Sequence, residues 1–169
     1  DPEPGQISWD ADHETLVVGL DAHVNLQVGQ EHVVRVKNQS TTTAIEDGKA
    51  VMFVGATGDT VVVSPASSNG SYDSNLLVGV TTESIPADGF GFVTQFGFVN
   101  GIKTDYAGWQ LGSFLYVDPT SPGDLTNTQP DSPAWRRPVA AVTRVQQSSG
   151  RILVRTLPST KINSLDDVT

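Results

Sequence analysis

The chain has 169 residues, a formal net charge of -9 and no cysteine. A chain of this length can bury about 70% of the surface that it exposes when unfolded, so it can form a core without disulfides. The absence of cysteine excludes disulfides and thiolate metal sites. Phosphate backbones and anionic lipids repel an acidic protein, and no apolar run approaches the ~20 residues of a membrane helix, so we predict neither nucleic-acid binding nor membrane insertion.

The predicted elements are almost all strands. Apolar and polar residues alternate with period two, and Gly, Pro, Asn and Asp punctuate them, whereas no stretch has helical period. Residues 55–59 place glycine in a hairpin turn, and residues 65–71 are expected to form a loop without internal order. In chain order the predicted strands cover 15–20, 31–37, 50–54, 60–64, 76–82, 90–99, 114–117, 138–145 and 151–156. The spacing predicts a small antiparallel β-barrel or sandwich preceded by a short β-hairpin.

We divide the chain into three parts. Residues 1–30 form an acidic N-terminal β-hairpin, residues 31–158 a β-barrel domain and residues 159–169 a C-terminal linker. A lone hairpin is marginal in water, so the apolar residues of the first part must pack on the barrel or on copies of themselves. Neither end resembles a natural terminus, so we expect a processed chain or a fragment. The candidate assembly face comprises Trp9, Leu16, Val18, Leu20, Val24 and Leu26.

Charge is unevenly spread along the chain. Residues 1–31 contain seven acidic side chains and no Lys or Arg, whereas residues 135–161 contain six basic side chains and no acid. One interpretation is that these are strand-edge charges that oppose aggregation. The other is that the acidic start docks on a basic surface of the same chain or of a neighbour.

The predicted strand over 90–99 carries four phenylalanines at alternate positions, so they share one face. We expect this face to be core. Gly91 and Gly97 fall on the opposite face, where we expect close packing.

The sequence lacks catalytic and metal-binding patterns. His13, His23 and His32 do not have the spacing of metal ligands within one element, and no Gly-x-Ser-x-Gly motif is present. Glycan hydrolysis needs two facing carboxylates, and nothing selects such a pair here. We therefore predict a protein that is not an enzyme, with no catalytic residues, no cofactor and no metal.

Four aromatic residues stand near glycine, proline and polar residues instead of in strands. Such rings can stack on sugars or contact a partner, and the alternative is that they pin loops to the ends of the barrel. These predicted exposed aromatics are Tyr72, Tyr106, Trp109 and Trp135.

Several short phrases along the chain resemble those of a known class of proteins. Residues 5–10, 14–20 and 24–31 contain a Trp-Asp opening, a Thr-Leu step and a Gln-x-Gly-Gln-Glu end. This order resembles phage tail-fibre and related virion proteins, with Glu14 where glycine is usual. Residues 48–155 are also similar to the small β-barrels of capsid decoration proteins, and residues 162–169 are similar to connectors between fibre modules. Further phrases that carry the resemblance lie at 47–56, 79–85, 91–94, 97–101, 112–117, 122–126, 133–135 and 150–155.

The resemblance implies a non-catalytic homotrimer without cofactor on the outer surface of a bacteriophage virion, in contact with other virion proteins. We expect a tail-fibre or appendage module that serves virion assembly and host attachment, with a host surface glycan as a further partner. The alternative is a capsid decoration or head-fibre protein that stabilises the head. A glycan-degrading tailspike domain is the more distant alternative.

Overall fold

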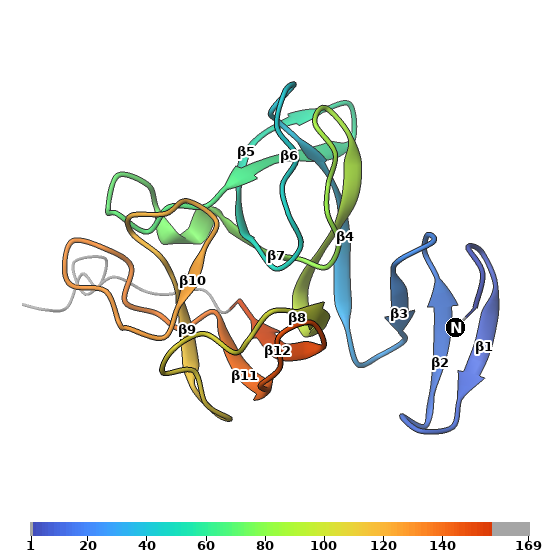
Figure 1. Cartoon of the computed structure of the whole chain (residues 1–169). Coiled ribbons are helices and arrows are strands. Elements are labelled where there is room, and N and C mark those ends of the chain that lie inside the picture. The colour runs from blue at the N-terminus through green and yellow to red at the C-terminus, as the bar shows by residue number, and fades with distance from the viewer. Residues whose placement is uncertain (1, 157–169) are drawn as a thin grey trace, which may run out of the picture.

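The computed structural model describes residues 2–156 and is almost entirely β-structure, with 46% strand and 2% helix (Figure 1). This confirms the predicted all-β class, whereas the predicted linker over 159–169 lies outside the described residues. A short 3₁₀ turn, η1 (Ser74–Leu76), precedes β7. The strands are β1 (Ile7–Asp10), β2 (Thr15–Gly19), β3 (Asn25–Gln27), β4 (His32–Asn38), β5 (Ala50–Thr57), β6 (Thr60–Pro65), β7 (Leu77–Thr81), β8 (Phe90–Ile102), β9 (Phe114–Val117), β10 (Leu125–Thr126), β11 (Ala140–Arg144) and β12 (Gly150–Arg155).

Five strands close into a barrel in the order β4–β6–β5–β7–β8, because β8 pairs with both β7 and β4. Four of these pairs are antiparallel. β4 and β6 run parallel, with Val36 opposite Val61, so the antiparallel expectation is wrong for this pair. Parallel neighbours need a crossover connection, and here β5 is part of that connection.

Strand β8 also belongs to a second sheet. Its first half pairs with β4 and β7, and its second half pairs with β12, with Phe98 opposite Leu153. The sheet continues from β12 through β11 and β9 to β10. One 13-residue strand therefore joins the barrel to the open sheet (Figure 1).

Small and branched aliphatic side chains form the core. Two buried clusters join the second sheet to the barrel: one contains Val80 of β7 with Leu115 and Ile152, and the other contains Met52 of β5 with Val117. The barrel cluster comprises Val36, Ile45, Val51, Val63, Ile85 and Val93.

The phenylalanines of β8 do not form the core, so that prediction is wrong. Phe90 and Phe96 are 44% and 43% exposed, and Phe92 and Phe98 are half-buried. A five-stranded barrel is narrower than the eight-stranded barrels whose interiors side chains just fill, so we infer that valine and glycine fit inside and phenylalanine does not. The buried residues of β8 are Gly91, Val93, Thr94, Gly97 and Val99.

The glycines of β8 permit close packing, as the sequence predicts. A Cβ on Gly91 would lie 2.7 Å from Cγ1 of Ile85, and a Cβ on Gly97 would lie 2.7 Å from Cγ of Glu31. Any larger residue at either position would collide with these side chains.

Residues 65–71 are tied to the fold by hydrogen bonds, contrary to the expectation of a loop without order. Ala66 is buried and its N–H donates to the carbonyl of Ala50 at 2.9 Å. The Oγ of buried Ser68 donates to the carbonyl of Val117 at 2.6 Å. The loop therefore links the barrel to the second sheet.

Asn38, the last residue of β4, organises the nearby end of the barrel. Its fully buried Nδ2 group donates to the carbonyls of Thr43 and Pro86 at 2.8 and 3.1 Å. Its Oδ1 accepts from the N–H of Ser40 at 2.9 Å. One side chain thus holds the loop after β4 against the loop before β8.

We predict that Asn38→Ala destabilises the protein by about 2–4 kcal/mol, because it leaves buried polar groups without their partner. Urea unfolding measures the change in the free energy of unfolding. Gln39→Ala, at the exposed neighbouring position, is the control and should change stability by at most about 0.5 kcal/mol. Equal stability of the two variants would contradict the role given to Asn38.

Candidate assembly site

The N-terminal sheet, β1–β2–β3, stands beside the barrel (Figure 1). One of its two faces carries apolar side chains. Trp9 lies opposite Leu16, and Ile7 lies opposite Val18, which in turn lies opposite Leu26. Residues opposite each other project from the same side of a sheet, so these five side chains form a continuous surface. We call it the N-terminal apolar face.

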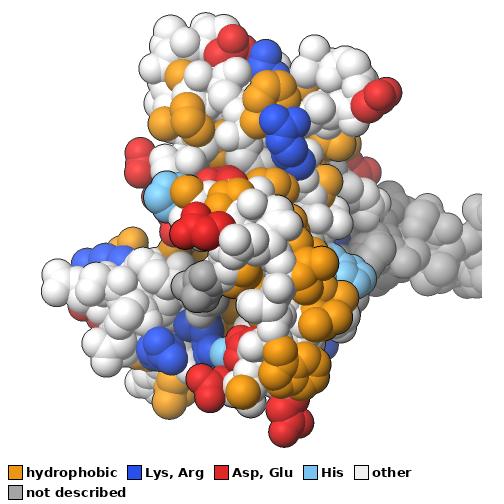
Figure 2. Space-filling view, turned by 90° about the vertical axis from the view of Figure 1, so that its right-hand side faces the viewer, with side chains coloured by type: hydrophobic (Ala, Val, Ile, Leu, Met, Phe, Trp, Pro, Cys, Tyr) orange, Lys and Arg blue, Asp and Glu red, His pale blue; other side chains and the backbone are white. Residues whose placement is uncertain are grey.

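This face is open to solvent. Ile7, Trp9 and Leu16 are 67%, 63% and 47% exposed, and exposed Val28 lies next to Leu16 through a hydrogen bond from its N–H. Viewed from the side of this sheet, the surface shows a band of hydrophobic side chains with acidic side chains at its border (Figure 2). Contiguous exposed apolar surface of this kind is typical of interaction sites.

The sequence identified much of this face but not all of it. Trp9, Leu16, Val18 and Leu26 lie on it as a group, whereas Leu20 follows the end of β2 and is half-buried. Val24 is buried, so its place on an exposed face is wrong. Ile7 was missed, although the apolar–polar–apolar alternation of Ile7, Ser8 and Trp9 is a usable signal.

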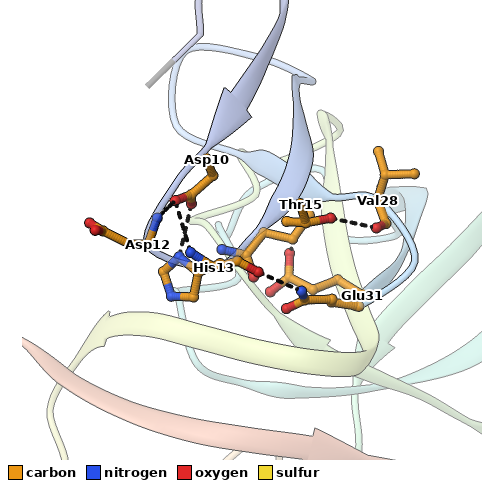
Figure 3. Close-up of polar contacts among 8 residues, drawn as sticks. Asp10, Asp12, His13, Thr15, Val28 and Glu31 are labelled. Atoms are coloured by element: carbon orange, nitrogen blue, oxygen red, sulfur yellow. Dashed lines mark hydrogen bonds and ion pairs between the residues drawn. The ribbon is translucent and has the colours of Figure 1, made fainter.

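The turn between β1 and β2 is fixed by its own side chains. Asp10 accepts from the N–H groups of Asp12 and His13 at 2.9 and 3.1 Å, and its other oxygen meets Nδ1 of His13 at 2.8 Å (Figure 3). The hydrogen bond from the His13 side chain is the main cause that lowers the pKa of Asp10. Glu14 has φ +50°, a left-handed conformation that favours glycine. This is the position where the resemblance described above leads us to expect glycine.

A groove separates the opposite face of the N-terminal sheet from the barrel. Val17 and Gln27 line it on the sheet side, and Val33, Thr94 and Phe98 line it on the barrel side. Because Val17 points into the groove, the N-terminal apolar face points away from it.

Glu31 connects the N-terminal sheet to β8. Its carboxylate accepts from the N–H of Gln27 at 3.1 Å and from the N–H of Phe98 at 3.3 Å. Burial raises the pKa of Glu31, and these two hydrogen bonds oppose that increase. Thr15 adds a bond from its Oγ1 to the carbonyl of Val28 at 2.8 Å, which secures the chain just before Glu31 (Figure 3).

A second connection joins the β2–β3 turn to the barrel. Glu83 accepts from the N–H of Phe92 at 2.8 Å and shares a hydrogen bond with the side chain of Asp21. Burial, with the proximity of Asp21 as a smaller cause, raises the pKa of Glu83 to about 7, although the hydrogen bond from Phe92 and the effect of His23 oppose this increase. A Glu83 carboxyl that is protonated can donate the hydrogen bond to Asp21 and so connect the turn to the barrel.

The predicted exposed aromatics divide into two pairs. Tyr72 and Tyr106 are exposed, so contact with a glycan or partner stays a prediction for them. Trp109 and Trp135 are buried, and their predicted exposure is wrong. The Nε1 group of Trp135 donates to the carbonyl of Tyr72 at 2.8 Å, which is the loop-pinning role that the sequence left open.

A second groove contains acidic and aromatic residues but no evident catalytic arrangement. Tyr106 and Trp109 line it, with ring centroids 4.9 Å apart. Burial raises the pKa of Asp47, also in this groove, to about 6. Lys49 forms an ion pair with Asp124 beside it. This mixture of charges suits polar contact more than it suits nucleophilic chemistry.

Over residues 2–156, no group of three or more His, Asp or Glu side chains is placed to hold a metal ion. Over the same residues, no helix has the length and apolar character needed to cross a bilayer.

The comparisons with known proteins include a distant structural likeness. No family model matches the chain, and no curated protein matches it. The crystal structure of the N base of head fiber gp8.5 in bacteriophage phi29 is similar over 78% of this chain and 99% of that chain, with 12% sequence identity and a TM-score of 0.45. A likeness at this level identifies no family and assigns no function.

We predict that Glu83→Gln makes stability less dependent on pH. The pKa of Glu83 in the folded protein, about 7, lies above its ordinary value of 4.5, so the folded state holds more protons between these values and the parent loses stability as pH rises through that window. Glutamine keeps an oxygen for the N–H of Phe92 but does not ionise. Urea unfolding from about pH 5 to pH 8 should show a smaller loss for the variant than for the parent.

Asp59→Asn is the matched control, since it also removes one carboxylate, from an exposed turn between β5 and β6. It should keep the pH dependence of the parent. If Glu83→Gln also keeps that dependence, the protonated Glu83 is not part of the connection to the N-terminal sheet.

Proposed function

We propose that this chain is a non-catalytic structural protein on the outside of a bacteriophage virion, where it assembles as a homotrimer. The phage context comes from the resemblance of its phrases to virion proteins. The assembly comes from the N-terminal apolar face, and that exposed face is the single observation that carries the proposal.

The argument for self-assembly is energetic. Ile7, Trp9 and Leu16 are held on a sheet by paired strands, and together with Val18 and Leu26 they expose apolar area that a monomer leaves in water. Burying apolar surface yields about 25 cal/mol per Å², and aromatic anchors such as tryptophan dominate many interfaces. A side-by-side arrangement of identical copies buries the same face in each of them.

Between the two positions on the virion, we favour the head, as a decoration protein or the base of a head fibre. Residues 48–155, which resemble decoration barrels, contain every strand of the closed barrel except β4. They also contain the whole of the second sheet. The same kind of protein is named for the similar phi29 structure, and the proposal does not depend on that distant likeness. A tail-fibre module remains the competing assignment.

We predict that the intact chain sediments as a trimer at micromolar concentration and that Leu16→Glu converts it to a monomer. A charge at the centre of an apolar contact loses the burial of leucine and adds the cost of desolvating a carboxylate. Ser8→Glu, which adds the same charge on the opposite side of β1, is the control and should leave the trimer intact. A monomeric parent would refute the proposed assembly.

We predict that gold-labelled antibody against this chain decorates the heads of the virions that carry it. Electron microscopy of labelled particles gives the position directly. Label confined to the tails would support the tail-fibre assignment, and an absence of label from intact particles would contradict a place on the virion exterior.

A further inference from the structure

A second apolar surface lies on the outer side of the second sheet, which β8, β12, β11 and β9 form (Figure 1). The inner side of these strands belongs to a buried cluster that includes Val99, Ile152 and Leu115. Because side chains alternate along a strand, the residues next to these point outward. The pairing places four such residues in one row, each opposite the next, and the register shifts of these pairings lie outside the row. We call it the outer row; its residues are Phe98, Leu153, Ala141 and Phe114.

The outer row is accessible to solvent and is flanked by arginines. Phe114 is exposed and Leu153 is half-buried. Arg151 and Arg155 stand two residues before and two residues after Leu153 on β12, so they project from the same side of the sheet. The guanidinium carbon of Arg151 lies 4.4 Å from the ring centroid of Phe98, and a stacked guanidinium loses less conformational freedom when it binds a carboxylate. Neither arginine forms an ion pair within residues 2–156.

The outer row therefore suits a partner that has an apolar centre and an acidic border. The N-terminal apolar face has this composition. Asp12 and Glu14, in the β1–β2 turn, lie at its border, and residues 2–31 contain no Lys or Arg. The match favours the second interpretation of the uneven charge, in which the acidic start docks on a basic surface.

The two surfaces cannot meet within one chain. The groove beside the N-terminal sheet has Val17 on one wall and Phe98 on the other. The N-terminal sheet thus turns its Val17 side toward the second sheet of its own chain, and its apolar face points away. A partner for the outer row must therefore come from another copy.

We propose that the N-terminal apolar face of one copy docks on the outer row of the next copy, so that each contact joins two different surfaces. This inference rests on the proposed self-assembly and names the two surfaces that form it. Docking of like surfaces would instead bring together two acidic borders, or two sets of arginines, at the cost of like-charge contact. Three copies that are joined in this way by a rotation close into a ring, which is the proposed trimer.

The test uses full-length variants and sedimentation velocity. Phe114→Glu damages the outer row and leaves the N-terminal apolar face intact, whereas Leu16→Glu does the opposite. Phe53→Glu is the matched control for Phe114→Glu, because Phe114 is 59% exposed on β9 and Phe53 is 42% exposed on β5, outside the row. Melting temperature and the fluorescence of buried Trp109 and Trp135 report whether each variant is folded.

We expect Phe114→Glu to weaken the trimer by about 10-fold or more, as the loss of an aromatic interface residue does, and Phe53→Glu to leave it unchanged. At a concentration where the parent is a trimer and Phe114→Glu and Leu16→Glu are each monomers, a mixture of the two should form a heterodimer. One intact surface of each kind remains in the mixture, and these two can form one contact.

A charge reversal tests the arginines separately. Arg155→Glu should weaken the trimer, whereas Arg136→Glu should not, since it makes the same change of charge in the exposed connection before β11. Added salt should weaken the parent trimer more than the Arg155→Glu trimer, because it screens the attraction that this variant has already lost. Equal affinities for Arg155→Glu and Arg136→Glu would overturn the match of opposite borders.

The outcomes separate this inference from the proposed function. A monomeric parent would refute self-assembly as such. A trimeric parent whose Phe114→Glu variant has the same affinity would leave self-assembly standing and overturn the docking on the outer row. A folded Phe114→Glu monomer that forms no heterodimer with Leu16→Glu would show that like surfaces meet, and would also overturn it.

Discussion

Strand β8 can belong to two sheets because the side chains that it buries are small along its whole length. Gly91 and Val93 face the barrel interior, and beyond a register shift near Gln95 the buried residues Gly97 and Val99 face the core of the second sheet instead. The narrow barrel admits nothing larger at Gly91, since Ile85 already fills the space. Phe90 and Phe92 therefore lie on the outside of the barrel, whereas Phe96 and Phe98, beyond the register shift, lie on the side of the strand away from Val99 and its cluster. The same constraint thus builds the joint between the sheets and leaves aromatic surface exposed.

The positions of the strands could be predicted from the sequence, but the inner face of β8 could not. Alternation is a local property, and the predicted strand over 114–117 coincides with β9. The choice of inner face depends on the width of the barrel, which is set by the distant pairings of β8 with β4 and of β4 with β6. Side-chain size relative to that width outweighs hydrophobicity here, so the larger apolar residues lie outside.

The candidate assembly site could also be predicted only in part. The apolar alternation in β1 and β2 is sufficient to suggest an unpaired face, but the burial of Val24 depends on the third strand, which folds back after β2. Trp135 follows Pro133 in a polar connection and therefore has the sequence context of an exposed residue. It is buried because the loop after β6 passes over it, and Ser68 accepts its N–H at 2.8 Å. Contacts between segments that are distant in the chain decide both cases.

The fold brings together charged residues that lie far apart in the sequence. The acids of residues 2–31 border an apolar face, while the bases beside the phenylalanines come from β4 and β12, which are far apart in sequence and flank β8. Surface charges contribute little affinity but strongly affect which surfaces meet and in which orientation. An apolar face can therefore supply binding energy, while the charges at its border limit which surfaces it meets. In the proposed assembly, that separation of roles would direct the exposed N-terminal apolar face to a specific contact instead of indiscriminate aggregation.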